Sequence, residues 1–265
     1  IPCPDGMVRP VILILLEELV ASGIEEICLV LGSEEERQLY RDYFETPLSK
    51  EHLSKLSPAA LDYENHIQNI GKRLQYVIQT EKLGFGHAVY QTRDFAGNEP
   101  VLLMLGDTLY RSATNKPCAL QLIENFELHS KLTVSVHPIP LAEVSRYGIL
   151  SGVWEDKKRT VMNVSQMAEK PTVGYAEEFL GINGPDGQKE YYSVFGQYIL
   201  TPEVYEQLAA DIIEHYENSD STREIELTTA LEAVRRNYGM VGVRIEGEMF
   251  DMGNPAALKN VYRKY

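Results

Sequence analysis

The sequence predicts an α/β protein, a three-layer α/β/α sandwich around a mixed, mostly parallel central sheet. Two observations predict it. Apolar strand-like runs alternate with helix-like segments through the first half of the chain, which is the pattern of βα winding. The second half is richer in strands, so the sheet should be more antiparallel there. At 265 residues the chain is long enough for one large domain with a substantial core.

Start and stop signals mark the expected elements of the first half. Pro10 opens a helix that Gly23 closes, because proline fits the first turn of a helix and glycine the turn after its end. Ser33 caps an acidic first turn, which the positive end of a helix favours. We expect helices over 10–22, 33–44, 57–70, 86–95 and 119–129, and strands over 26–31, 74–79, 101–105 and 132–136.

The second half should add four strands and three helices. The segment 181–187 is dense in glycine, proline, asparagine and aspartate, so we expect a mobile surface loop there. The strands should cover 147–153, 159–167, 191–200 and 240–245, and the helices 202–217, 225–237 and a final stretch near Leu258.

Composition excludes several classes of protein. The net charge of −14 argues against a nucleic-acid-binding surface. No apolar run approaches the roughly 18–20 residues of a membrane span, so no membrane partner is expected. Three cysteines without metal-ligand spacing favour a reduced, cytoplasmic protein. An acidic enzyme acting on a phosphate would have to recruit a metal or local cations.

The stretch 79–107 carries the first functional signal. An apolar run from Val101 to Leu105 ends on Gly106-Asp107, as when a buried parallel strand delivers an acid to the carboxyl edge of a sheet, where ligands bind. Gly84 and Gly86 form a loop that a flat or phosphorylated ligand could approach closely, and the aspartate could hold Mg²⁺. An aspartate that only caps a turn is equally compatible with this stretch alone.

Further motifs follow in order, and together they resemble a known family. They are Tyr147-Gly148, Glu169-Lys170-Pro171, Gly196-Gln197-Tyr198 and Phe250-Asp251-Met252-Gly253. With Gln79, Gly84 and Asp107, this series resembles the sugar-1-phosphate nucleotidyltransferases, and most closely the bacterial UTP–glucose-1-phosphate uridylyltransferases. The resemblance covers nearly the whole chain. It implies the Rossmann-like nucleotide-diphospho-sugar transferase fold, with a nucleotide-binding half over about 1–140 and a sugar-binding half over about 141–265.

The resemblance assigns roles in the nucleotide half. Gln79 and Gly84 match the residues that read a uracil or thymine base. Asp107 and Asp251 match the pair that coordinates one Mg²⁺ against the nucleotide phosphates. Thr108 stands where relatives often have a second acidic or amide residue, which alters the edge of the metal site. Without the resemblance, we would interpret Gln79 as a polar residue at the end of a strand and Asp251 as a turn residue.

The resemblance also assigns roles in the sugar half. Glu169 should bind sugar hydroxyls and Lys170 the sugar phosphate, where a mobile ammonium suits a phosphate. Gly148 and Gly196 should let the backbone approach the sugar ring. On the residues alone, Glu169-Lys170-Pro171 could be a surface ion pair, and both glycines could serve turns or strand crossings.

The implied reaction makes UDP-glucose and pyrophosphate from UTP and glucose-1-phosphate. A sugar-phosphate oxygen attacks the α-phosphorus in line, and its negative charge makes a general base unnecessary. Asp107, Lys170 and Asp251 are the catalytic candidates, with Mg²⁺ as the cofactor. We also expect a homo-oligomer, a dimer or a tetramer.

The same residues are also compatible with other functions. The nucleotide could be dTTP, CTP or ATP, because pocket shape decides such choices. A non-catalytic sugar-nucleotide-binding homologue would keep the same pockets. A glycosyltransferase would usually show an Asp-x-Asp motif, and none follows Leu105. Relatives begin with a strand and a Gly-rich loop that carries an Arg and then a Lys. None of these precedes Ile1, so we expect an N-terminal segment beyond this sequence.

Overall fold

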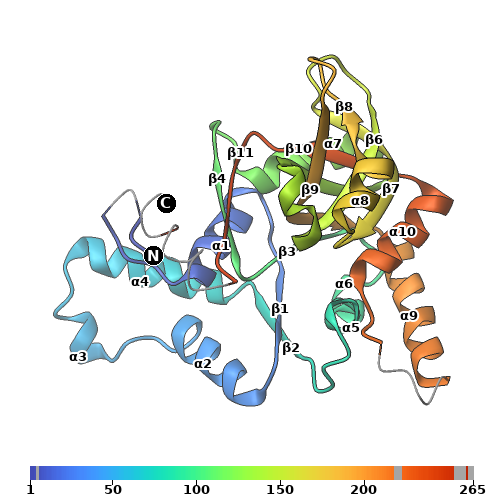
Figure 1. Ribbon diagram of the computed structural model, residues 1–265. Coiled ribbons are helices and arrows are strands. Elements are labelled where there is room, and N and C mark those ends of the chain that lie inside the picture. Colours follow the sequence, from blue (N-terminus) through green and yellow to red (C-terminus); the bar gives the residue numbers. More distant parts are fainter. Residues whose placement is uncertain (4–5, 218–222, 254–260, 262–265) are drawn as a thin grey trace.

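The computed structural model describes residues 1–3, 6–217, 223–253 and 261. Figure 1 shows a large mixed sheet with helices on both of its faces, and a smaller α/β part formed by the N-terminal segments beside it. The large sheet has the order β3-β9-β5-β10-β7-β6, with β8 paired to β9. The three-layer α/β arrangement expected from the sequence is therefore confirmed.

The strands of the large sheet agree closely with the expected segments. Their bounds are β3 (Val101–Met104), β5 (Leu132–Ile139), β6 (Gly148–Trp154), β7 (Val161–Glu169), β8 (Ile182–Asn183), β9 (Lys189–Leu200) and β10 (Met240–Arg244). β8 lies inside the segment expected to be a loop, and it pairs with the start of β9.

The expectation of a mostly parallel sheet needs correction. Among the described strands, only β5–β10 and the separate pair β1 (Ile27–Leu31) with β2 (Leu74–Ile78) run parallel. The long strand β9 runs antiparallel to β3, β5 and β6. Whether two strands run parallel or antiparallel depends on which segments of the chain pair. The alternation of helices and strands along the sequence does not reveal that pairing.

The 101–105 segment differs from the buried parallel strand that its sequence suggested. β3 pairs antiparallel with β9, and all four of its residues are only half-buried. β1 has a similar pattern, with buried ends and half-buried middle residues. A cavity of about 930 Å³ separates these two apolar strands, which explains their exposure.

Two short strands were missed by the sequence analysis. β4 (Thr108–Ser112) and β11 (Gly247–Asp251) form an antiparallel ribbon in which Asp251 lies opposite Thr108. The ribbon packs through Leu109, Tyr110 and Phe250 into a core cluster shared with α1 and β9.

Helices cover both faces of the large sheet. α1 (Val11–Ala21) and α7 (Cys118–His129) share one core cluster with it, and α5 (Phe85–Tyr90), α9 (Pro202–Glu217) and α10 (Leu227–Tyr238) share another. The other helical segments are α2 (Glu34–Phe44), α3 (Lys50–Leu53), α4 (Pro58–Gly71), α6 (Arg93–Ala96), η1 (Leu141–Arg146), α8 (Val173–Tyr175) and η2 (Ala176–Leu180).

The predicted helix starts agree with the observed ones to within two residues, and one predicted helix is divided. The Ser33 hydroxyl accepts a hydrogen bond from the Glu36 N–H at 3.2 Å. The helix expected over 86–95 is divided into α5 and α6 near Thr92, whose hydroxyl donates to the Val89 carbonyl at 2.7 Å. The final helix expected near Leu258 lies outside the described residues. Among the described helices, none has the length and apolarity needed to cross a membrane.

Candidate active site

Asp107 and Asp251 come together through the β4–β11 ribbon. The Met252 N–H donates to the Asp107 carbonyl at 2.8 Å, and the Gly253 N–H donates to Asp251 Oδ1 at 2.7 Å. A Cβ atom at Gly253 would lie 3.2 Å from Asp107 Oδ2 and 3.1 Å from Asp251 Oδ1. Both carboxylates therefore face the same small space, although they are far apart in the sequence.

This pair of carboxylates suits a hard divalent cation. Oxygen ligands are what Mg²⁺ prefers, and two carboxylates leave its other positions for phosphate oxygens and water. Thr108 Oγ1 donates to Asp107 Oδ1 at 3.3 Å, so the threonine orients the carboxylate. In the part of the chain that the structure describes, no group of three or more acidic, histidine or cysteine side chains gathers as a complete metal cage.

Arg146 adds a positive charge beside these acids. Its Nη2 lies 3.8 Å from Asp251 Oδ2, and its guanidinium carbon lies 5.2 Å from the ring centre of Tyr147. The Tyr147 carbonyl in turn accepts a hydrogen bond from the Lys170 N–H at 3.1 Å. Arg146 and Tyr147 therefore connect the aspartate pair with the Glu169-Lys170 segment.

Gln79 is held by its surroundings at the end of β2. Its Nε2 donates to the Gly84 carbonyl at 3.2 Å and lies 3.1 Å from Nδ1 of the buried His87. His87 Nε2 is 3.0 Å from Gln91 Nε2, so the imidazole lies between two amides. With its nitrogen engaged, Gln79 has its carbonyl oxygen left for a ligand N–H. Two paired hydrogen bonds from this amide to a base would require these contacts to change.

Gly84 has a packing reason to be glycine. Its φ is +115°, and a Cβ atom there would lie 2.7 Å from the Ile225 carbonyl oxygen. The Gly86 N–H donates to that same carbonyl at 2.8 Å, and the Ile225 N–H donates to the Leu83 carbonyl at 2.7 Å. The glycine loop is therefore attached to the segment that precedes α10.

Glu169 and Lys170 lie at the end of the β6–β7 hairpin. Gly148 is the direct partner of Glu169 across the two strands, and a Cβ at Gly148 would lie 3.1 Å from Glu169 Oε2. The backbone bends at Lys170, where φ is +41°, and the Lys170 Nζ returns to 3.7 Å from Glu169 Oε1. A residue that precedes proline usually has an extended backbone, and Lys170 departs from this preference. The bend instead brings the two opposite charges together.

Thr228 holds the other oxygen of Glu169, a role that the sequence analysis did not find. Its hydroxyl donates to Glu169 Oε2 at 2.8 Å from the first turn of α10. The buried Tyr198 is also near: burial first, and then the charge of Glu169, raises the pKa of its phenol. Thr228 belongs to the segment Glu224-Ile225-Glu226-Leu227-Thr228, which leads into the first turn of α10.

Gly196 also has a packing explanation. Its φ is +88°, and a Cβ atom there would lie 2.6 Å from the Tyr110 hydroxyl. That hydroxyl donates to the Gly196 carbonyl at 2.9 Å. The glycine thus allows β9 to pass close to the β4–β11 ribbon, and its expected contact with a sugar stays a prediction.

The sequence resembles characterised nucleotidyltransferases along its length. A family model described as nucleotidyl transferase matches residues 2–265. UTP–glucose-1-phosphate uridylyltransferase 1 of Staphylococcus saprophyticus is 30% identical over 249 residues, which are 92% of this chain and 77% of that protein.

Solved structures show the same similarity. An apo UDP-glucose pyrophosphorylase superposes with a TM-score of 0.77 at 27% identity, covering 97% of this chain and 87% of that one. A UDP-glucose pyrophosphorylase in complex with UDP-glucose gives a TM-score of 0.73 at 25% identity, covering 97% of this chain and 88% of that one.

Proposed function

Because this chain belongs to the nucleotidyl transferase family, we propose that it makes UDP-glucose and pyrophosphate from UTP and glucose-1-phosphate. The observation that carries the proposal is the convergence of Asp107 and Asp251 on one space beside Gly253. The relative from Staphylococcus saprophyticus supports this pair of substrates by its name, and the complex with UDP-glucose supports the product.

In this proposal each half of the site holds one substrate. The Gln79 carbonyl and the Gly84 backbone bind the uracil base, and Gly148 and Glu169 bind the glucose. Lys170, whose ammonium is largely exposed, binds the sugar phosphate. Asp107 and Asp251 would hold Mg²⁺, which supplies positive charge to the nucleotide phosphates when bound.

The chemistry needs positioning more than proton transfer. An anionic oxygen of glucose-1-phosphate forms a bond to the α-phosphorus of UTP, the bond from that phosphorus to the bridging oxygen breaks, and pyrophosphate leaves with the electron pair. Lys170 would hold the attacking phosphate in line and reduce its repulsion from the nucleotide. The nearby Arg146 contributes further positive charge at the junction of the two halves.

The experiment that tests the function is pyrophosphate release with Mg²⁺ and glucose-1-phosphate, comparing UTP, dTTP, CTP, ATP and GTP. Preference for UTP is the expected result. Preference for another nucleotide would keep the reaction class and change the substrate. If folded protein releases pyrophosphate with none of the five, a non-catalytic sugar-nucleotide binder becomes the better description.

Two variants separate the roles of the site residues. Asp107→Asn should lower turnover roughly 10²-fold, because it removes a charge that holds the metal. Asp62→Asn on the exposed surface of α4 makes the same chemical change and should leave turnover intact.

Lys170→Ala should chiefly raise the KM for glucose-1-phosphate, while Lys157→Ala, at the opposite end of the β6–β7 hairpin, should not. Full activity in Asp107→Asn or Lys170→Ala would remove that residue from the mechanism.

A further inference from the structure

His87 is a buried histidine that has no role in the reaction as proposed so far. It lies in the first turn of α5, and it is 7% exposed. Its two ring nitrogens contact two side-chain amides: Nδ1 lies 3.1 Å from Gln79 Nε2, and Nε2 lies 3.0 Å from Gln91 Nε2. In a neutral imidazole one nitrogen donates and the other accepts, so the ring connects the orientations of the two amides.

The Gly84 carbonyl decides the orientation of the Gln79 amide. This carbonyl accepts from the Ala88 N–H at 3.1 Å and from Gln79 Nε2 at 3.2 Å. A carbonyl can only accept, so the nitrogen of the Gln79 amide must face it. The opposite orientation would place two oxygen acceptors against each other. The carbonyl therefore distinguishes the two ends of the amide, although they have nearly the same shape.

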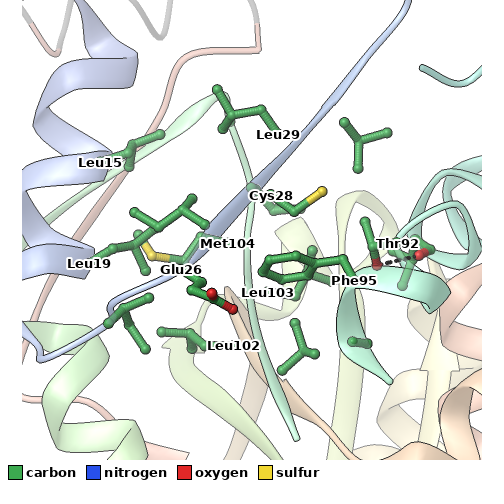
Figure 2. A pocket seen from close by; sticks show the side chains of 18 of the residues that line it. Leu15, Leu19, Glu26, Cys28, Leu29, Thr92, Phe95, Leu102, Leu103 and Met104 are labelled. Atoms are coloured by element: carbon green, nitrogen blue, oxygen red, sulfur yellow. Dashed lines mark hydrogen bonds between the residues drawn. The ribbon is translucent and has the colours of Figure 1, made fainter. Parts of the chain in front are cut away.

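The surroundings of this carbonyl are held on both sides of α5. Ahead of the helix, the Gly86 N–H donates to the Ile225 carbonyl at 2.8 Å. Just beyond the helix, the Thr92 hydroxyl lies 2.8 Å from the Tyr205 hydroxyl of α9, a hydrogen bond that can be followed in Figure 2. The helix that carries His87 is therefore fixed relative to α9 and to the segment before α10.

The orientation of Gln79 assigns the tautomer of His87. Gln79 Nε2 carries two hydrogens, one for the Gly84 carbonyl and one for His87 Nδ1. A ring nitrogen accepts only when it is unprotonated, so the ring hydrogen of His87 is on Nε2. Both hydrogens of the Gln79 amide are then used, and its oxygen is left for a ligand.

Gln91 completes this chain of hydrogen bonds. The Nε2–H of His87 needs an acceptor, which the oxygen of the Gln91 amide supplies when that amide is turned about its end. The turn removes a side-chain donor from the His87 carbonyl, at 3.3 Å. That carbonyl keeps the Gln91 backbone N–H, which is also at 3.3 Å, so it stays satisfied.

A single orientation of the Gln79 amide can separate two pyrimidine bases. The Gln79 oxygen can accept from the N3–H of uracil. Cytosine carries no hydrogen on N3, so it would place a second acceptor against the same oxygen. A site built around a hydrogen bond rejects a ligand that lacks it, because the polar group of the protein is left unpaired.

We propose that His87 is a positioning residue, which holds the Gln79 amide with its oxygen toward the nucleotide and thereby selects a base with an imide N–H. This role rests on the proposed function, because it explains the base selectivity of that same site. His87 acts through Gln79 and need not touch either substrate. The Gly84 carbonyl sets the orientation, and Gln91 accepts the remaining ring hydrogen.

The first test reads the tautomer without any nucleotide. In a long-range nitrogen–proton correlation spectrum of protein with isotope-labelled histidines, the pattern of cross-peaks distinguishes an Nδ1–H ring from an Nε2–H ring. His87 should show the Nε2–H pattern, and the variant His87→Asn assigns its cross-peaks by their loss. The Nδ1–H pattern would overturn the proposal, because Gln79 would then turn its oxygen to the ring.

The second test compares the equilibrium binding of UTP and CTP by calorimetry, without glucose-1-phosphate. His87→Phe keeps a planar ring but removes the acceptor, so UTP should bind about tenfold more weakly and its preference over CTP should be largely lost. His87→Asn keeps an acceptor near the position of Nδ1, and it should retain the preference. This rescue distinguishes the hydrogen bond of His87 from its packing.

His129→Phe is the matched control. His129 on α7 also engages both ring nitrogens, with Nδ1 2.8 Å from the Asn125 carbonyl oxygen and Nε2 3.2 Å from Glu155 Oε2. Its replacement should leave the binding of both nucleotides unchanged. An unchanged preference for UTP in folded His87→Phe would overturn the proposal, and so would a loss in His87→Asn. If His87→Phe does not fold, the tautomer of the parent and the binding by His87→Asn decide.

The role of His87 and the proposed reaction can fail separately. Selective binding of UTP without release of pyrophosphate would refute the reaction and keep the role of His87. Release of pyrophosphate from UTP and CTP at equal rates, with equal binding of the two, would keep the reaction class and refute that role.

Discussion

Single polar side chains hold the charged groups of the candidate site in position. The clearest case is Thr228, which holds the Glu169 carboxylate. It lies in the first turn of α10 and donates a hydrogen bond of 2.8 Å to Glu169 Oε2. The Lys170 Nζ lies 3.7 Å from the other oxygen, Oε1. Glu169 is therefore held from two sides, and the hydroxyl of Thr228 limits the rotamers that the carboxylate can use.

Replacing Thr228 with valine should weaken binding of the sugar substrate. Valine keeps the shape of the side chain but removes the hydroxyl, so we expect the KM for glucose-1-phosphate to rise roughly tenfold with a smaller change in kcat. Steady-state kinetics with varied glucose-1-phosphate measure this split. Thr228→Ser keeps the hydroxyl and should restore the KM. An unchanged KM in Thr228→Val would show that Glu169 needs no such support.

At the scale of elements, the glycine loop before α5 depends on the segment before α10. Gly86 and Leu83 exchange backbone hydrogen bonds with Ile225, and Ile225 itself is 5% exposed. The loop also contains the carbonyl that fixes Gln79. The position of the proposed base-binding residues is therefore set by a segment more than half the chain away.

A methyl group at Gly84 should disrupt this junction. Gly84 and Gly97 both have positive φ, of 115° and 57°, but a Cβ at Gly84 meets the Ile225 carbonyl at 2.7 Å and one at Gly97 meets nothing within 4 Å. Gly97→Ala should lower the free energy of unfolding by roughly 1 kcal/mol, the cost of conformation alone. Gly84→Ala should lower it by roughly 3 kcal/mol, because overpacking is added.

Urea denaturation of the two variants measures this difference. If both alanine variants lose the same stability, the contact with Ile225 adapts and the loop does not require glycine at position 84. A loss of UTP preference in Gly84→Ala, in protein that stays folded, would further connect the junction with base recognition.

At the scale of the whole molecule, Glu18 joins three distant parts of the chain. Its carboxylate on α1 accepts hydrogen bonds from the Ala119 N–H and from Gln197 Nε2, both at 3.0 Å. These partners belong to α7 and β9. Burial raises the pKa of Glu18 above its ordinary 4.5, against the opposing effect of these hydrogen bonds.

The stability of the fold should therefore depend on pH through Glu18. When folding raises the pKa of an acid, protonation of that acid stabilises the folded state. This stabilisation is fully present at pH values below the pKa of the unfolded state, and it is lost as pH rises through the pKa of the folded state. Glu18→Gln does not titrate. We expect the free energy of unfolding of this variant, relative to that of the parent, to increase as pH rises from below 4.5 through the raised pKa of Glu18.

Denaturant unfolding over a pH series measures this effect, and Glu35→Gln is its control. The backbone N–H of Glu35 and the Ser33 hydroxyl lower the pKa of the Glu35 carboxyl. The contribution of this carboxylate to the stability of the fold is therefore lost as pH falls. The relative stability of Glu35→Gln should change in the opposite direction. A constant difference between Glu18→Gln and the parent at all pH values would contradict the assignment.

Local signals in the sequence were enough to locate most of the helices and strands and the polar residues at the strand ends. Ser33 and Ser57 begin helices as predicted, because capping is local and needs no partner far along the chain. The motif order was likewise sufficient to indicate the family. The boundary near residue 140 and the oligomeric state stay predictions.

Which residues meet depends on contacts between distant segments, and the folded chain was needed to see them. Asp107 and Asp251 converge because β4 and β11 pair, and two five-residue strands carry too little pattern to reveal that pairing. Thr228 reaches Glu169 because α10 packs against β7, and β3 stays half-buried because a slot separates it from β1. Local propensity acts over a few neighbouring residues, whereas strand pairing and side-chain convergence are set by contacts between segments that only the folded chain brings together.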